Sequence, residues 1–171
     1  MRRMLMIVAV LVVAFIALVL VFRRPLPACD RATWSAARER WRANEVADYR
    51  IAVRVSGRQA ATYEAEVRGG EVQWAKRNGQ PLKQSRTLGT WSIPGMFVTM
   101  QLDLDSIDRA AKLAPAKIQP TLTLRARFHA ELGYPLEYHR IETGSGGSNP
   151  EVYWKVERFE VLSNEARDDE G

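Results

Sequence analysis

Residues 48–74 read DYRIAVRVSGRQAATYEAEVRGGEVQW, and this stretch decides the fold. From Tyr49 to Val55 every second side chain is large and apolar, which is the period of a strand with one buried face. The alternation returns around Tyr63. After the Gly69-Gly70 turn, a third strand begins near Val72 and closes at Asn78-Gly79. The stretch therefore predicts a three-stranded antiparallel meander with its other face in water.

On the amino-terminal side of the meander, the sequence predicts a short helix. Asp30 or Thr33 can cap it, and it runs to about Ala43. Trp34 and Trp41 lie on one narrow apolar stripe of this helix, opposite a charged face. We expect the stripe to pack against the core.

On the carboxyl-terminal side, residues 81–90 are expected to form a loop, and a second helix runs from Pro94 to about Leu113, with a break near Asp103 compatible with the pattern. Three more strands follow. They cover residues 122–128, the stretch from the Gly133-Tyr134-Pro135 turn to about 143, and residues 152–161, the last with a bulge near 157–158.

The predicted fold class is α+β, with an N-terminal transmembrane helix followed by one small domain. A curved antiparallel sheet of about six strands, packed by two helices, buries both helical stripes. The expected boundaries are a transmembrane anchor at 1–24, a linker at 25–30, the domain at 31–163 and a disordered acidic tail at 164–171.

The anchor is predicted from Met4–Phe22, which has nineteen residues without a charge, a polar side chain, Pro or Gly. As a helix it spans roughly 28 Å, close to the hydrocarbon thickness of a bilayer and longer than the core of a cleaved signal. We expect an uncleaved signal-anchor in the cell membrane, single-pass. The short tail before it, Met1 to Arg3, favours an extracytoplasmic domain, although the arginines after it favour the opposite orientation.

The single cysteine offers an alternative to the uncleaved anchor. Leu26-Pro27-Ala28-Cys29 resembles a bacterial lipoprotein cleavage box, in which Cys29 would be the lipidated residue. The charged residues Arg23 and Arg24 separate the apolar run from this box, which favours the uncleaved anchor. A single thiol forms neither an internal disulfide nor a structural zinc site.

The charge distribution argues against nucleic-acid binding. The formal net charge is +5, but four arginines flank the apolar run, and the other 21 Lys and Arg are balanced by 20 Asp and Glu. They are spread along the chain without the basic stripe that a phosphate-binding surface needs.

Three stretches of the sequence are similar to an uncharacterised bacterial envelope domain, a family known as a domain of unknown function. They are the helix ending at Trp41 with Asp48-Tyr49, the segment Trp91-Ser92-Ile93-Pro94-Gly95-Met96-Phe97, and Leu132-Gly133-Tyr134-Pro135-Leu136. The resemblance implies a secreted or lipid-anchored envelope protein and brings no catalytic residues. Many members carry a cysteine pair near the first hairpin, which this chain lacks.

The two histidines of the chain suggest one specific hypothesis, a metal-binding site. If the hairpin is centred on Tyr134, His129 faces His139 and Glu131 faces Glu137, and the four side chains could bind zinc. The alternative is the polar, solvated face of a hairpin. No P-loop, dinucleotide fingerprint, paired-cysteine motif or nucleophile elbow occurs in the sequence, so neither an enzyme nor a cofactor is predicted.

Three functional hypotheses follow. The first is a non-catalytic, membrane-tethered envelope domain that binds a protein, peptide or envelope polymer through its sheet face or an open strand edge. The second is a metal-dependent enzyme or metal-binding domain that uses the hairpin histidines. The third is a structural subunit of a membrane complex, for which a broad apolar face is expected.

Overall fold

The computed structural model describes residues 25–57, 60–83, 85–112, 121–144 and 151–163. Their elements follow in the order α2 Arg31–Ala43, β1 Tyr49–Gly57, β2 Ala61–Arg68, β3 Glu71–Arg77, β4 Gln80–Pro81, α3 Ser85–Leu88, the 3-10 turn η1 Gly89–Trp91, α4 Ile93–Lys112, β5 Thr121–Phe128, β6 Pro135–Thr143 and β7 Glu151–Val161.

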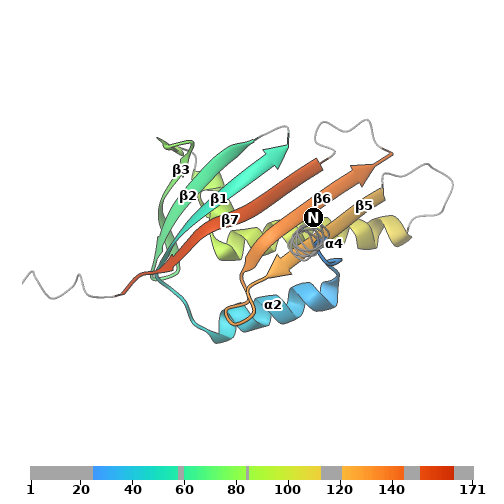
Figure 1. The fold of residues 1–171 in the computed structure, drawn as a ribbon, viewed down its shortest axis with the longest axis horizontal. Helices are drawn as coiled ribbons and strands as arrows, with labels where there is room; N and C mark the ends of the chain where they lie inside the picture. The colour runs from blue at the N-terminus through green and yellow to red at the C-terminus, as the bar shows by residue number, and fades with distance from the viewer. Residues whose placement is uncertain (1–24, 58–59, 84, 113–120, 145–150, 164–171) are drawn as a thin grey trace, which may run out of the picture.

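The strands form one curved antiparallel sheet in the order β4-β3-β2-β1-β7-β6-β5. Figure 1 shows α4 behind the sheet and α2 along its lower side. The predicted curved sheet and its two packing helices are confirmed. The sheet has seven strands rather than about six, because the two residues of β4 fold back on the end of β3.

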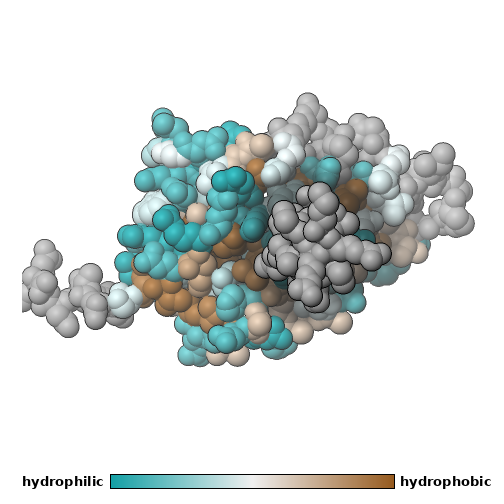
Figure 2. Space-filling view, viewed as in Figure 1, coloured by the Kyte–Doolittle hydropathy of each residue, from teal (hydrophilic) through white to brown (hydrophobic). Residues whose placement is uncertain are grey.

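The alternation that predicted the meander is confirmed by the burial of its side chains. In β2, for example, Tyr63 and Val67 are buried while Glu64 and Glu66 are not. Figure 2 shows mainly hydrophilic side chains on the opposite face over β1 to β3, the face that the sequence predicted to be wet. Cross-strand ion pairs lie on it, such as the 2.7 Å contact between Arg50 Nε and Glu66.

The predicted bulge in the last strand is also confirmed. The pairing of β1 with β7 shifts by one residue between Ala52, which faces Arg158, and Val53, which faces Val156. The extra residue is Glu157. Trp154 and Val156 occupy even positions of β7, whereas Phe159 occupies an odd one. The extra residue at the bulge lets all three side chains face the core.

The helices follow the sequence with two corrections. Asp30 caps α2 by accepting a hydrogen bond from the Thr33 backbone N–H at 2.8 Å. The second helix, α4, is continuous and has no break near Asp103, whose carboxylate accepts hydrogen bonds from β6. Residues 81–90 are not a plain loop, since they contain α3 and most of η1.

The three stretches that carry the family resemblance meet at one place in the core. The ring of Trp41 lies edge-on to Tyr49 at 5.6 Å and to Tyr134 at 6.3 Å, while Phe159 stacks on Tyr134 at 4.3 Å. The Tyr49 hydroxyl accepts a hydrogen bond from the backbone N–H of Ile93 at 3.0 Å. These residues therefore join both helices, β1, β7 and the β5–β6 turn, which is a packing role.

Among the described residues, no helix combines the length and the apolar character that crossing a membrane requires. The predicted anchor, Met4–Phe22, lies outside the described residues, as does the predicted acidic tail.

Candidate ligand-binding pocket

The structure does not bring together the four side chains predicted as metal ligands. The β5–β6 register places Arg125, not His129, opposite His139, and Arg127 opposite Glu137. The expected pairing, with the two histidines facing each other, is therefore wrong by four positions. No group of three or more His, Cys, Asp or Glu side chains among the described residues is arranged to hold a metal ion.

The turn between β5 and β6 explains the difference in register. His129 Nδ1 accepts hydrogen bonds from the backbone N–H groups of Glu131 at 3.3 Å and Leu132 at 3.1 Å, and its ring stacks on Tyr134 at 4.9 Å. His129 thus closes the turn. His139 lies on the outer face of the sheet, where its Nε2 contacts Glu151 at 2.7 Å. The two histidines have separate local partners.

Cys29 is buried, with 6% of its surface exposed. Its backbone N–H donates to the Leu124 carbonyl at 2.9 Å, and the Ala126 N–H donates to the Pro27 carbonyl at 3.0 Å, so the linker pairs with the edge of β5. Burial, with a contribution from the Asp30 charge, raises the pKa of the thiol to about 11. The thiol is therefore neutral and covered in the folded domain.

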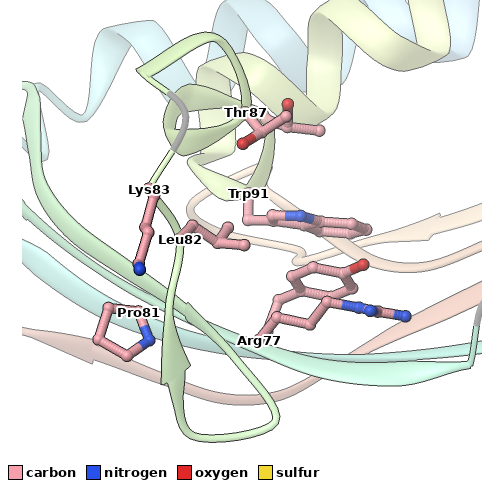
Figure 3. Close-up of a pocket in the computed structure, with 8 residues that line it drawn as sticks. Arg77, Pro81, Leu82, Lys83, Thr87 and Trp91 are labelled. Carbon is pink, nitrogen blue, oxygen red and sulfur yellow. The ribbon is translucent and has the colours of Figure 1, made fainter.

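A cavity of about 650 Å³ lies between the β3–β4 hairpin and the α3–η1 segment, and we call it the Trp91 pocket (Figure 3). This volume is in the range of small-ligand sites. Its lining residues come from five elements and their connections: Tyr63, Arg77, Pro81, Leu82, Lys83, Thr87, Thr90 and Trp91.

The aromatic wall of the pocket is held rigidly. The Trp91 ring stacks on Tyr63 with centroids 4.0 Å apart and planes 18° apart, and it meets Trp154 edge-on at 6.2 Å. In Figure 3 the Trp91 ring points into the pocket between Leu82 and Thr87. A fixed, partly exposed indole presents a flat apolar surface to a ligand at a small entropic cost.

The backbone next to Trp91 is held equally firmly. The Ser92 hydroxyl donates to the Gly89 carbonyl at 2.7 Å and accepts from the Gly95 N–H at 3.2 Å, which caps the start of α4. A Cβ on Gly95 would lie 1.9 Å from the Gly89 carbonyl oxygen, so only glycine allows this close approach. The Trp91–Phe97 stretch therefore serves to position the pocket wall.

Two cations flank the pocket. In Figure 3, Arg77 and Lys83 lie on opposite sides of Leu82, so their charges do not converge on one point. Neither forms an ion pair with a residue that the structure describes. Two separated, unpaired cations beside an aromatic wall suit an extended ligand with spaced acidic groups better than a single anion.

A second polar cluster lies between α4 and β6. Asp103 accepts a hydrogen bond from the Tyr138 hydroxyl at 2.6 Å and from Arg140 Nε at 3.0 Å, and Arg140 also contacts Glu142 at 2.7 Å. Burial and the Asp103 carboxylate raise the pKa of Tyr138 well above its usual range. Each oxygen of the carboxylate accepts a hydrogen bond from β6, so this cluster joins helix to sheet.

Sequence reasoning missed the Trp91 pocket because its residues are spread from 63 to 91 and share no motif. The sequence predicts a loop at residues 81–90, which supply most of the lining residues, and the Trp91 segment enters only through the family resemblance. One usable signal is the pair Arg77 and Lys83, which lie near each other in sequence without an acidic neighbour between them.

No protein-family model, no curated protein and no solved structure matches this chain significantly.

Proposed function

We propose that this chain is a non-catalytic, membrane-tethered envelope domain, anchored by Met4–Phe22 and extracytoplasmic, that binds an extended acidic peptide segment of an envelope protein in the Trp91 pocket. The observation that carries the proposal is the combination of a rigid, partly exposed indole with the two unpaired cations Arg77 and Lys83.

An open strand edge adjoins the pocket and supports a peptide as the ligand. The short strand β4 pairs only with Lys76 and Arg77, and the Leu82 N–H reaches the Ala75 carbonyl at 2.9 Å. The first part of β3, from Glu71 to Trp74, has no pairing partner on this outer side among the described residues. An extended peptide can add to such an edge and place side chains in the neighbouring pocket.

The exposed apolar side chains favour this function over that of a structural subunit. Among the described residues, the large apolar side chains that are exposed are Val98 and Leu102 on α4 and Val161 at the end of β7. They do not form the broad apolar face expected of a subunit buried in a complex.

The position of Cys29 supports the uncleaved anchor. A diacylglyceryl group on the sulfur of this buried residue would have to displace the core around it and break the pairing of the linker with β5. The separate environments of His129 and His139 leave the metal hypothesis without a site among the described residues.

The test is binding of a hexaglutamate peptide to the full-length chain in detergent micelles, measured by calorimetry. We expect the double variant Arg77→Gln, Lys83→Gln to lower the affinity by about tenfold or more, because two charge-assisted contacts are lost. The matched control is Lys112→Gln, Lys155→Gln, which removes the same charge from exposed positions on α4 and β7. Equal losses in the two variants would show only general charge attraction and would contradict the proposed site.

A further inference from the structure

The linker after the predicted anchor is packed against the domain and pairs with its sheet. It lies antiparallel along the outer edge of β5 with Ala28 opposite Arg125, and two backbone hydrogen bonds join it to Leu124 and Ala126. The Arg125 guanidinium also donates to the Leu26 carbonyl at 2.9 Å. The buried Cys29 side chain holds the end of the linker in the core. The linker therefore closes part of this edge as an additional short strand.

Little chain separates this docked segment from the apolar run. Only Arg23, Arg24 and Pro25 stand between Phe22 and Leu26 in the sequence. Four Cα-to-Cα steps cover at most roughly 14 Å, even when fully extended. If Met4–Phe22 spans the bilayer, as the proposed function requires, the β5 edge must lie close to the membrane surface.

The Trp91 pocket lies at the other end of the sheet. Its residues come from β2, β3, β4 and the segment that follows, whereas the linker is attached to β5, the last strand in the order β4-β3-β2-β1-β7-β6-β5. Six strand spacings separate β4 from β5, which corresponds to roughly 29 Å along the sheet. On the outer face between them, Arg50 pairs with Glu66 and Arg54 with Glu157. Figure 2 shows mainly hydrophilic side chains over β1 to β3 on this face.

We infer that the docked linker makes the β5 edge the membrane-facing side of the domain and holds the Trp91 pocket away from the bilayer. This inference rests on the proposed anchoring. The ligand of the pocket is then a peptide in the aqueous space beyond the lipid headgroups. A membrane lipid is excluded as the ligand.

The experiment is fluorescence quenching by a lipid with a nitroxide on its headgroup, in phosphatidylcholine vesicles that contain the full-length chain. Single labels are placed through Ala130→Cys, in the exposed turn after β5, or Gln80→Cys, in the exposed β3–β4 hairpin. Cys29 is kept, because its buried thiol does not react with the label in the folded protein. We expect the label at 130 to be quenched at least about threefold more than the label at 80, because short-range quenching does not reach across the sheet.

An insertion variant gives the matched control. About ten Gly and Ser residues placed between Pro25 and Leu26 leave the docked segment unchanged but lengthen the tether, so the difference between the labels is expected to shrink. Equal quenching at 80 and 130 without the insertion would overturn the inference. Failure of the protein to float with the vesicles would instead contradict the anchoring. Hexaglutamate binding is measured in a separate experiment, so failure of the proposed ligand can be distinguished from failure of the anchoring or of the orientation.

Discussion

Gly133 shows at the scale of a single residue how the turn after β5 is fixed. Its φ of +78° lies in the left-handed region, and a Cβ there would lie 2.3 Å from the Ala37 carbonyl oxygen and 2.9 Å from the Trp41 nitrogen. The backbone of the turn thus lies directly against α2, which only glycine allows.

Gly133→Ala is therefore expected to destabilise the protein by roughly 2–3 kcal/mol, because strain and a backbone clash add. Gly69→Ala is the matched control, since Gly69 also has a positive φ, +57°, but has nothing within 4 Å of the added methyl group. We expect it to cost about 1 kcal/mol. Chemical unfolding of the full-length chain in detergent measures both, and equal losses would contradict the close packing of the turn on α2.

Glu66 makes the stability of the sheet depend on pH. A hydrogen bond from Arg50, together with a weaker one from Arg68, lowers the pKa of Glu66, whose side chain is 13% exposed. Because the folded-state pKa lies below that of the unfolded chain, the stabilisation is complete above about pH 4.3 and is lost as the pH falls through the folded-state value.

We expect Glu66→Gln to lower the free energy of unfolding by roughly 1 kcal/mol at neutral pH and to have almost no effect at about pH 3. The matched control is Glu71→Gln, which changes an exposed carboxylate without an ion pair among the described residues. The measurement is urea unfolding at the two pH values. A Glu66→Gln penalty that persists in acid would refute the ionic explanation.

The predictions made for single residues differ in how well they agree with the structure. The spacing of Tyr49 to Val55 was sufficient to predict which side chains are buried, since a two-residue period leaves only two choices of face. The pairing of His129 with His139 was not predictable, because the length of a turn depends on contacts such as those of Gly133 with α2, which are distant in sequence.

At the scale of secondary-structure elements, α4 is attached to the sheet through Asp103. This carboxylate is 17% exposed and accepts hydrogen bonds from the Tyr138 hydroxyl and from Arg140, both on β6. Removal of the carboxylate would leave a half-buried cation and a buried hydroxyl without these contacts.

Asp103→Ala is expected to cost roughly 2–3 kcal/mol of stability, and Asp103→Asn less, because the amide oxygen can still accept from Tyr138. Asp105→Ala is the control two residues away. Asp105 is 38% exposed and pairs with the exposed Arg31, so we expect a loss below about 1 kcal/mol. Thermal unfolding followed by near-ultraviolet circular dichroism distinguishes the variants, and indistinguishable Asp103→Ala and Asp105→Ala values would contradict the attachment of α4 through Asp103.

Most elements were predictable from the sequence because their patterns are local. The Asp30 cap, the meander and the bulge at Glu157 all follow from short periods and turn residues. The strand β4 and the helical turns before α4 were not predicted, since their residues have no period of their own and are held by Tyr63, Ser92 and Gly95.

At the scale of the whole molecule, the two ends of the sheet have different roles in our account. The docked linker occupies the β5 edge, and the Trp91 pocket lies beside β3 and β4 at the other edge. The pairing of β1 with β7 joins the two halves and fixes this separation. The sequence predicted a tether and a domain, but not that the linker is part of the sheet, because a linker with two prolines has no strand period.

The most direct test of the central claim, an uncleaved anchor continuous with a docked linker, is the intact mass of the protein extracted from membranes after maleimide treatment under native conditions. We predict a chain that retains Met4–Phe22, without an adduct on Cys29 until the protein is denatured. A shorter chain that begins at a lipid-modified Cys29, or rapid labelling of the native protein, would contradict the account.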